Sequence, residues 1–202
     1  MKKYFFLLFL SLSISNFTNA QDYKLFKLGA GIGYASSIAF SNGFSLAFEP
    51  AFNLNNNFSI SFKIEGNYFD QTVLDTASYV TLGGLFFNSI VNSLKATFIE
   101  SYTFNSKYYV IQGKKFRPYA GIGVGAYHRQ EGVIDAYGNE VKVIKANAFG
   151  FSTLAGFDFG HFNLALDYNI LPGEESYLNK SINYFSARVG YFFGGGKKKV
   201  AK

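Results

Sequence analysis

Hydrophobic and polar residues alternate one by one through much of this chain, most clearly in the segment 58–68, FSISFKIEGNY. Its even-numbered positions are apolar apart from one glycine, and its odd-numbered positions hold serine, lysine, glutamate and asparagine. A period of two predicts a β-strand. One apolar face and one charged face suit a strand that lies between membrane hydrocarbon and a polar lumen.

The same alternation recurs to the end of the chain. Eight segments show it: 25–36, 43–52, 58–69, 91–104, 116–128, 147–159, 162–170 and 183–193. Eight strands is the smallest number usual for outer-membrane barrels. The pattern therefore predicts an all-β fold, an eight-stranded antiparallel up-and-down transmembrane β-barrel.

Two positions interrupt the pattern. Pro50 cannot donate a ladder hydrogen bond, which predicts a bulge or the end of the second segment. Glu100 falls in the outward, apolar phase of the fourth segment, where a charge at mid-bilayer would be costly. A bulge or a position near the membrane edge would accommodate this carboxylate.

Connection lengths provide an independent check on the barrel. With a periplasmic N-terminus, the long connections 70–90, 129–146 and 171–182 are predicted to be external loops. The connections 53–57 and 159–161 are short and periplasmic, whereas 105–115 is longer than expected for that side. Short periplasmic turns and longer external loops are usual for such barrels.

The two ends of the chain have a different character. Residues 1–20 combine two lysines, an apolar run and a small-residue site ending at Ala20, which predicts a secretory signal peptide. That run is too short for a transmembrane helix. We expect a barrel over 21–193, followed by a flexible basic tail, 194–202. The absence of cysteine excludes disulfides, thiol catalysis and a lipid anchor at the cleavage site.

The formal charge of +6 gives no indication of an acidic partner. It comes from 19 basic and 13 acidic residues, and the predicted signal peptide and tail contain six of the lysines. Removing these leaves 19 − 6 = 13 basic residues against 13 acidic ones. The predicted barrel is therefore neutral, which argues against nucleic-acid binding.

One motif carries a family resemblance. The segment 115–127, KFRPYAGIGVGAY, resembles the Arg-Pro-Tyr-x-Gly-x-Gly-x-Gly segment of the porin-family outer-membrane β-barrel domain of Gram-negative bacteria. The resemblance implies an outer-membrane location with membrane lipid as the surroundings, and it implies no single activity. The last predicted strand ends at Phe193 and is similar to the signal read by the outer-membrane assembly machinery, although here a tail follows.

The inward phase of the predicted strands supplies the candidate functional residues. They form a nearly balanced set of charges: Lys27, Glu49, Lys63, Glu65, Lys95, Arg117, Asp158, Asp167 and Arg188. Interior side chains fill an eight-stranded barrel. Because unpaired buried charges are costly, these residues are interpreted as a salt-bridged polar network in a filled lumen, in preference to an ion or solute path.

Other chemistry finds weaker support. The glycines at 29, 31 and 33 and at 121, 123 and 125 lack the spacing of a dinucleotide fingerprint, and segment 135–140, DAYGNE, lacks the spacing of a calcium loop. Small outer-membrane barrels include lipid A deacylases and acyltransferases that use histidine, serine and an acidic residue. Neither His128 nor His161 is paired in sequence with a nucleophile. We expect no catalytic, cofactor-binding or metal-binding residues and no cofactor.

Three functions remain open. The preferred one is a structural or surface-interaction role, with an extracellular ligand bound through the loops 70–90, 129–146 and 171–182, since loops on a rigid scaffold commonly carry binding sites. A passive porin or a channel for small or hydrophobic solutes is the alternative. A lipid-modifying outer-membrane enzyme is third.

Overall fold

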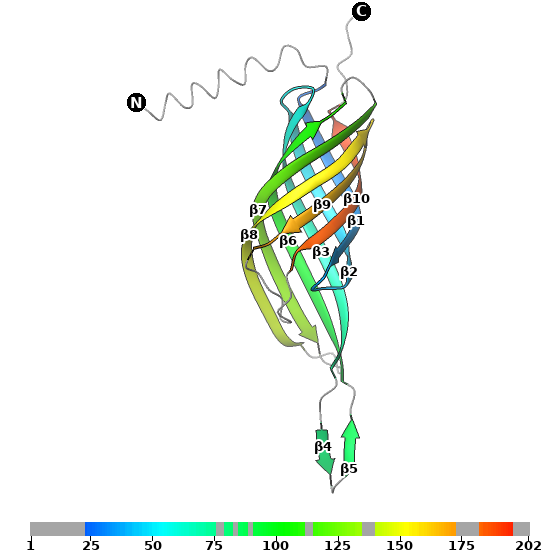
Figure 1. Cartoon of the computed structure of the whole chain (residues 1–202), viewed down its shortest axis with the longest axis vertical. Coiled ribbons are helices and arrows are strands. Elements are labelled where there is room, and N and C mark those ends of the chain that lie inside the picture. Colours follow the sequence, from blue (N-terminus) through cyan, green and yellow to red (C-terminus); the bar gives the residue numbers. More distant parts are fainter. Residues whose placement is uncertain are drawn as a thin grey trace, which may run out of the picture.

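A computed structural model describes residues 23–75, 79–82, 85–88, 91–111, 115–134, 140–172 and 182–195. Eight strands of this part close into an antiparallel barrel in the order β1-β10-β9-β8-β7-β6-β3-β2, and β4 and β5 form a separate two-stranded sheet (Figure 1). The predicted fold class is confirmed. The barrel strands are β1 (Phe26–Ser37), β2 (Asn42–Asn53), β3 (Phe58–Asp75), β6 (Val91–Tyr109), β7 (Phe116–Ile134), β8 (Glu140–Phe159), β9 (Phe162–Ile170) and β10 (Tyr184–Gly194); the small sheet contains β4 (Tyr79–Leu82) and β5 (Leu85–Asn88).

The predicted signal peptide and residues 196–202 of the predicted tail lie outside the described residues, so both stay predictions. No helix among the described residues is long and apolar enough to cross a membrane.

The register of the strand pairs fixes the geometry of the barrel. A path of cross-strand partners that begins at Phe26 passes once around the barrel and returns to β1 at Ser36, ten residues further along. With strand spacings of about 4.8 Å and a rise of about 3.3 Å per residue, a stagger of ten over eight strands tilts the strands by about 41°. Each residue then adds about 2.5 Å of height along the barrel axis, and each step to the next strand along the path adds about 3 Å.

Side chains alternate between lumen and exterior along every barrel strand. In β9, for example, Asn163, Asp167 and Asn169 are buried, while Leu166 and Tyr168 are exposed. The buried set is strongly polar, and the exposed set is almost entirely apolar. This is the inverse of a soluble protein and is the distribution expected of a barrel surrounded by lipid.

Two rings of exposed aromatic side chains mark the edges of the lipid-facing band. The inner aromatic ring, at the end of the barrel with the short turns, contains Phe26, Phe52, Phe116, Phe159, Phe162 and Phe193. The outer aromatic ring, at the opposite end, contains Tyr34, Phe44, Tyr68, Tyr102, Phe149, Tyr168 and Phe185. The register geometry separates the rings by about 20 Å, close to the apolar band of about 25 Å of outer-membrane barrels with its interfacial aromatic girdles. The chain is an outer-membrane β-barrel.

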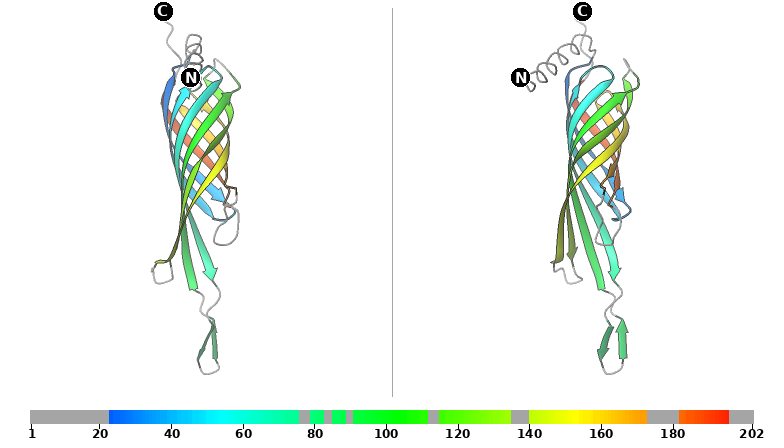
Figure 2. Two further views of the ribbon diagram at one scale, coloured as in Figure 1. Left: turned by 90° about the vertical axis from the view of Figure 1, so that its left-hand side faces the viewer. Right: turned by 60° about the vertical axis from the view of Figure 1, so that its left-hand side comes forward.

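The boundaries of two predicted external loops are corrected. Strands β3, β6, β7 and β8 continue well past the ends of the other four, into the predicted loops 70–90 and 129–146 (Figure 2). Outside the membrane both faces of a strand meet water, so the sequence no longer needs to alternate there. The predicted loop 171–182 lies outside the barrel strands, and its residues 173–181 are outside the described part of the chain.

Neither interruption in the pattern produces a bulge. The pairing of β2 with β3 keeps one register on both sides of Pro50, so the expectation of a bulge or strand end there is wrong: the missing donor only opens the ladder locally, and β2 continues to Asn53. The pairing of Glu100 with Gly66 and His128 is also regular. Glu100 lies at the level of the outer aromatic ring, where its carboxylate accepts a hydrogen bond of 2.7 Å from the Tyr102 hydroxyl.

Candidate functional site

The lumen of the barrel contains the predicted polar residues, arranged in successive levels along the axis. At the periplasmic mouth, the Arg117 guanidinium lies between the rings of Tyr23 and Tyr109, 3.7 and 4.0 Å from their centroids. Its Nη2 donates to the backbone oxygen of Asn56 at 2.9 Å. A planar cation stacked between two rings fills this mouth and attaches Tyr23, three residues before β1, to the barrel.

The next level pairs Lys27 of β1 with Asp158 of β8. Lys27 Nζ lies 3.0 Å from Asp158 Oδ2, and the Tyr109 hydroxyl donates to the same oxygen at 2.8 Å. Asn163 Nδ2 donates to the other carboxylate oxygen at 2.7 Å. Both oxygens of this buried carboxylate are therefore satisfied, as is usual for polar groups that are buried away from water.

A third level joins Glu49 to Lys107, a residue that sequence reasoning missed. Lys107 Nζ lies 2.5 Å from Glu49 Oε1, which also accepts a hydrogen bond from the Ser61 hydroxyl at 2.5 Å. The segment 105–115 was predicted to be a turn, although Asn105, Lys107 and Tyr109 continue the period of two from β6. That continuation was the signal available in the sequence.

The centre of the lumen holds a quartet of two cations and two anions: Lys63, Glu65, Asp167 and Arg188. Lys63 Nζ lies 2.6 Å from Glu65 Oε2 and 2.8 Å from Asp167 Oδ2. Arg188 donates to Asp167 and lies 3.7 Å from Glu65. All four side chains are at most 5% exposed, so each charge depends on the others for its compensation.

An apolar cluster closes the lumen above this quartet. The ring of Tyr184 packs edge to face with those of Phe69 and Tyr127, near the level of the outer aromatic ring. The residues that complete the cluster include Ile99, Leu171 and Ile182. The Tyr127 hydroxyl donates to Asn169 Oδ1 at 2.9 Å, which orients its ring across the lumen. The cluster lies between the quartet and the far end of the barrel.

Three charged residues, one predicted and two missed, lie further out. Lys95 is in β6 opposite Gln71 and Val133, but its side chain is outside the described part of the chain. Arg129 and Glu131, missed because they were assigned to a loop, face inward above the apolar cluster, with Arg129 Nη1 3.1 Å from Glu131 Oε1. The structure therefore places eight of the nine predicted residues in the lumen and brings seven of those eight into ion pairs with other side chains.

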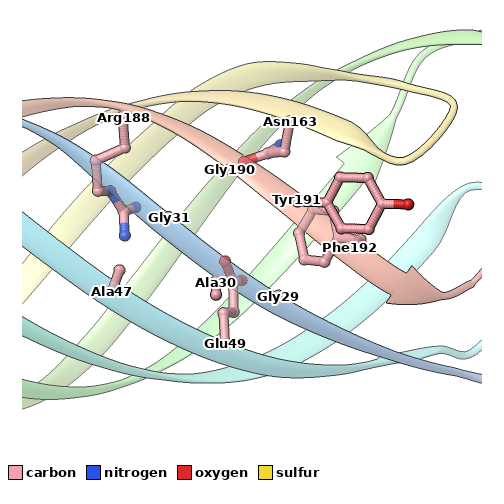
Figure 3. Close-up of a pocket in the computed structure, with 10 residues that line it drawn as sticks. All are labelled: Gly29, Ala30, Gly31, Ala47, Glu49, Asn163, Arg188, Gly190, Tyr191 and Phe192. Atoms are coloured by element: carbon pink, nitrogen blue, oxygen red, sulfur yellow. The ribbon is translucent and has the colours of Figure 1, made fainter.

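One small pocket lies in the inner wall where β1 meets its two neighbours. It has a volume of about 20 Å³, which is room for about one water molecule. Figure 3 shows Arg188 and Glu49, from β10 and β2 on the two sides of β1, lining it together with Gly29 and Gly31. A pocket of this size in the wall does not connect the two ends of the lumen.

The two histidines lie away from the lumen levels. His128 faces outward near the outer membrane edge, with Nδ1 2.5 Å from Asn147 Oδ1 and Nε2 3.2 Å from Gln130 Nε2. His161, in the turn after β8, donates from Nδ1 to the backbone oxygen of Phe192 at 2.8 Å and stacks on Tyr191. No group of three or more potential metal-ligating side chains occurs among the described residues.

Comparisons with known proteins add the following. No protein-family model matches the chain, and no curated protein matches it. Among solved structures, Ail, the attachment invasion locus protein of Yersinia pestis in complex with the heparin analogue sucrose octasulfate, is similar with a TM-score of 0.49 and 12% identity, over 84% of this chain and 100% of that one. Neisserial surface protein A gives 0.49 and 14%, over 85% and 98%, and the N-terminal β-barrel domain of Pseudomonas aeruginosa OprF gives 0.45 and 13%, over 87% and 100%.

Proposed function

We propose that this protein has a structural or surface-interaction role in the outer membrane and does not conduct solutes. The observation that carries the proposal is the filled lumen: a stacked arginine, three levels of ion pairs and an apolar cluster follow one another from mouth to mouth. Opening a path would require breaking buried charge pairs, each of which costs several kcal/mol when a partner is lost. A structural lumen leaves the external surface as the place for function.

The external surface is dominated by the extension of β3, β6, β7 and β8. From the outer aromatic ring these strands continue for about 17 to 28 Å, at about 2.5 Å of height per residue. The β3–β6 ladder reaches Asp75 and the β6–β7 ladder reaches Ile134. Within the described residues, β9 covers β8 only as far as Phe151, so 140–150 of β8 pair on one side. A strand edge of this kind suits addition of an extended peptide from a partner.

The filled lumen makes a direct prediction about conductance. The mature chain, residues 21–202, refolded into a planar lipid bilayer, is expected to give no reproducible current steps, while a porin added afterwards to the same bilayer does. The reason is that the ion pairs and the apolar cluster of the described residues fill the lumen between its two mouths. Discrete current steps whose size changes in Arg117→Ala or Asp167→Ala would contradict the structural lumen and support the channel alternative.

The role of the extension is tested by removing part of it. Asp70 of β3 and Ala96 of β6 are cross-strand partners, so a short turn can join them in place of 71–95. Cells that carry this variant are expected to lose binding to an array of extracellular proteins and sulfated glycans that cells with the full chain bind, because the extension is absent. The variant barrel should still fold, judged by its faster migration on gels before heating. Equal binding by both chains would contradict the role proposed for this part of the extension.

A further inference from the structure

A second site lies on the opposite side of the barrel wall, facing the membrane. A hollow of about 470 Å³ opens on the outer surface over β2, β3, β6 and β7. The side chains around it include Phe52, Ile60, Phe62, Phe104, Ser106 and Ile122. All six belong to the outward phase, and Ser106 is the only polar one among them.

The hollow arises from one small side chain. Ser106 pairs with Ile60 on one side and with Ile122 on the other, in the row of cross-strand partners that begins at Phe26. Phe62 and Phe104 form the wall of the hollow on the side toward the outer aromatic ring, and their ring centroids are 5.0 Å apart. A serine between bulky neighbours leaves the backbone of the sheet as the floor, and Gly123 lies on that floor.

The register geometry gives the depth of the hollow in the membrane. Relative to Phe26 in the inner aromatic ring, Ile60, Ser106 and Ile122 lie about 6, 9 and 13 Å higher. The hollow is therefore centred in the periplasmic half of the apolar band and is continuous with the surface that lipid already covers. At this depth the surrounding medium is hydrocarbon.

We propose that the hollow is a binding site for one acyl chain of a phospholipid from the periplasmic leaflet. A flexible hydrocarbon chain can follow an irregular apolar recess and make the dispersion contacts that an unfilled recess lacks. A second copy of the barrel fits less well. A two-fold contact through this face would set hollow against hollow, and an enclosed apolar void destabilises an interface.

Filling the hollow tests the proposal. The mature chain, Ser106→Phe and Thr153→Phe are each folded into vesicles of phosphatidylethanolamine and phosphatidylglycerol, extracted into a mild detergent and weighed by native mass spectrometry. Thr153 is a matched control: it is small, polar, exposed and in the same row, paired with Ile122 on the side away from the hollow. We expect one phospholipid on the unaltered chain and on Thr153→Phe, and at least about tenfold less on Ser106→Phe, which corresponds to about 1.4 kcal/mol of lost binding.

Three results would overturn the proposal. Equal lipid on all three chains would show that the hollow binds nothing specifically. Lipid lost from both variants would show that any bulky residue on the wall disturbs the lipid shell. A dimer that only Ser106→Phe abolishes would identify a second copy as the occupant. Should Ser106→Phe fail to migrate as a folded barrel, Ser106→Leu fills less of the hollow and is measured in the same way.

Discussion

Replacing Asp167 by asparagine is expected to lower the free energy of unfolding of the barrel by about 3 to 5 kcal/mol, the range found when one partner of a buried ion pair is removed. Asp167 accepts from both cations of the central quartet, and its side chain is fully buried. Without its charge, Glu65 is the one anion left in the quartet for Lys63 and Arg188, and the quartet carries a net positive charge. Urea unfolding of the refolded protein, followed by circular dichroism, measures the loss.

A matched control and a second variant identify the cause. Asp70 is exposed at the outer membrane edge, and Asp70→Asn is expected to change stability by no more than about 0.5 kcal/mol. The double variant Lys63→Met, Asp167→Leu removes one charge of each sign and leaves Arg188 with Glu65. Its loss of unfolding free energy should therefore be about 1 to 3 kcal/mol smaller than the sum of the losses caused by Lys63→Met alone and Asp167→Leu alone. Losses that simply add would show that the quartet is not coupled.

The wall of the barrel was the most predictable part of the molecule. Within the lipid-facing band, successive residues of a strand face hydrocarbon and a narrow lumen in turn, so odd and even positions must differ in polarity. Segment 162–170 follows this rule so clearly that the predicted strand and β9 have the same bounds. Parity alone also identified eight of the charged residues that face the lumen. The ends of β3, β6, β7 and β8 outside this band were missed because both faces of a strand meet water there, so polar and apolar residues need not alternate.

The pairing inside the lumen could not be predicted in the same way. Lys27 and Asp158 are 131 residues apart, and they meet only because the stagger of all eight strand pairs brings them to one level. An error of two residues in any register would preserve every parity and change every partner. Lys107 was missed for a local reason: its segment, 105–115, contains Asn, Ser and Gly, which also suit a turn.

The hollow on the outer wall was likewise not predictable from the sequence. In the sequence, Ser106 is an ordinary polar residue of the predicted turn 105–115. The side chains that surround it in the structure come from strands that are distant along the chain. Depth, width and floor follow from the register between β3, β6 and β7. Alternation identifies the face of a residue, whereas the shape of that face depends on which side chains become neighbours.

The last glycine of the Arg-Pro-Tyr-x-Gly-x-Gly-x-Gly segment, Gly125, has a physical reason that predicts a second large effect. Gly125 of β7 is buried on the inner face. A Cβ atom there would collide with the backbone oxygen of Tyr102 and lie 2.7 Å from Cα and 2.8 Å from Cγ2 of Thr103 on β6. Backbone atoms of a paired strand cannot move aside as the end of a flexible side chain can, so the close approach of β6 and β7 requires glycine.

Gly125→Val is therefore expected to prevent the barrel from closing, since the overpacking that costs about 1 to 3 kcal/mol in an adaptable core is here applied to two hydrogen-bonded backbones. The variant should give none of the fast-migrating folded form on unheated gels after refolding. Gly132→Val, in the same strand, is the matched control: the nearest atom to its added Cβ is the Ala96 backbone oxygen at 4.0 Å, and valine favours strands. Equal folding of the two variants would show that β6 and β7 can separate at Gly125, and the spacing of glycines in this motif would then need another cause.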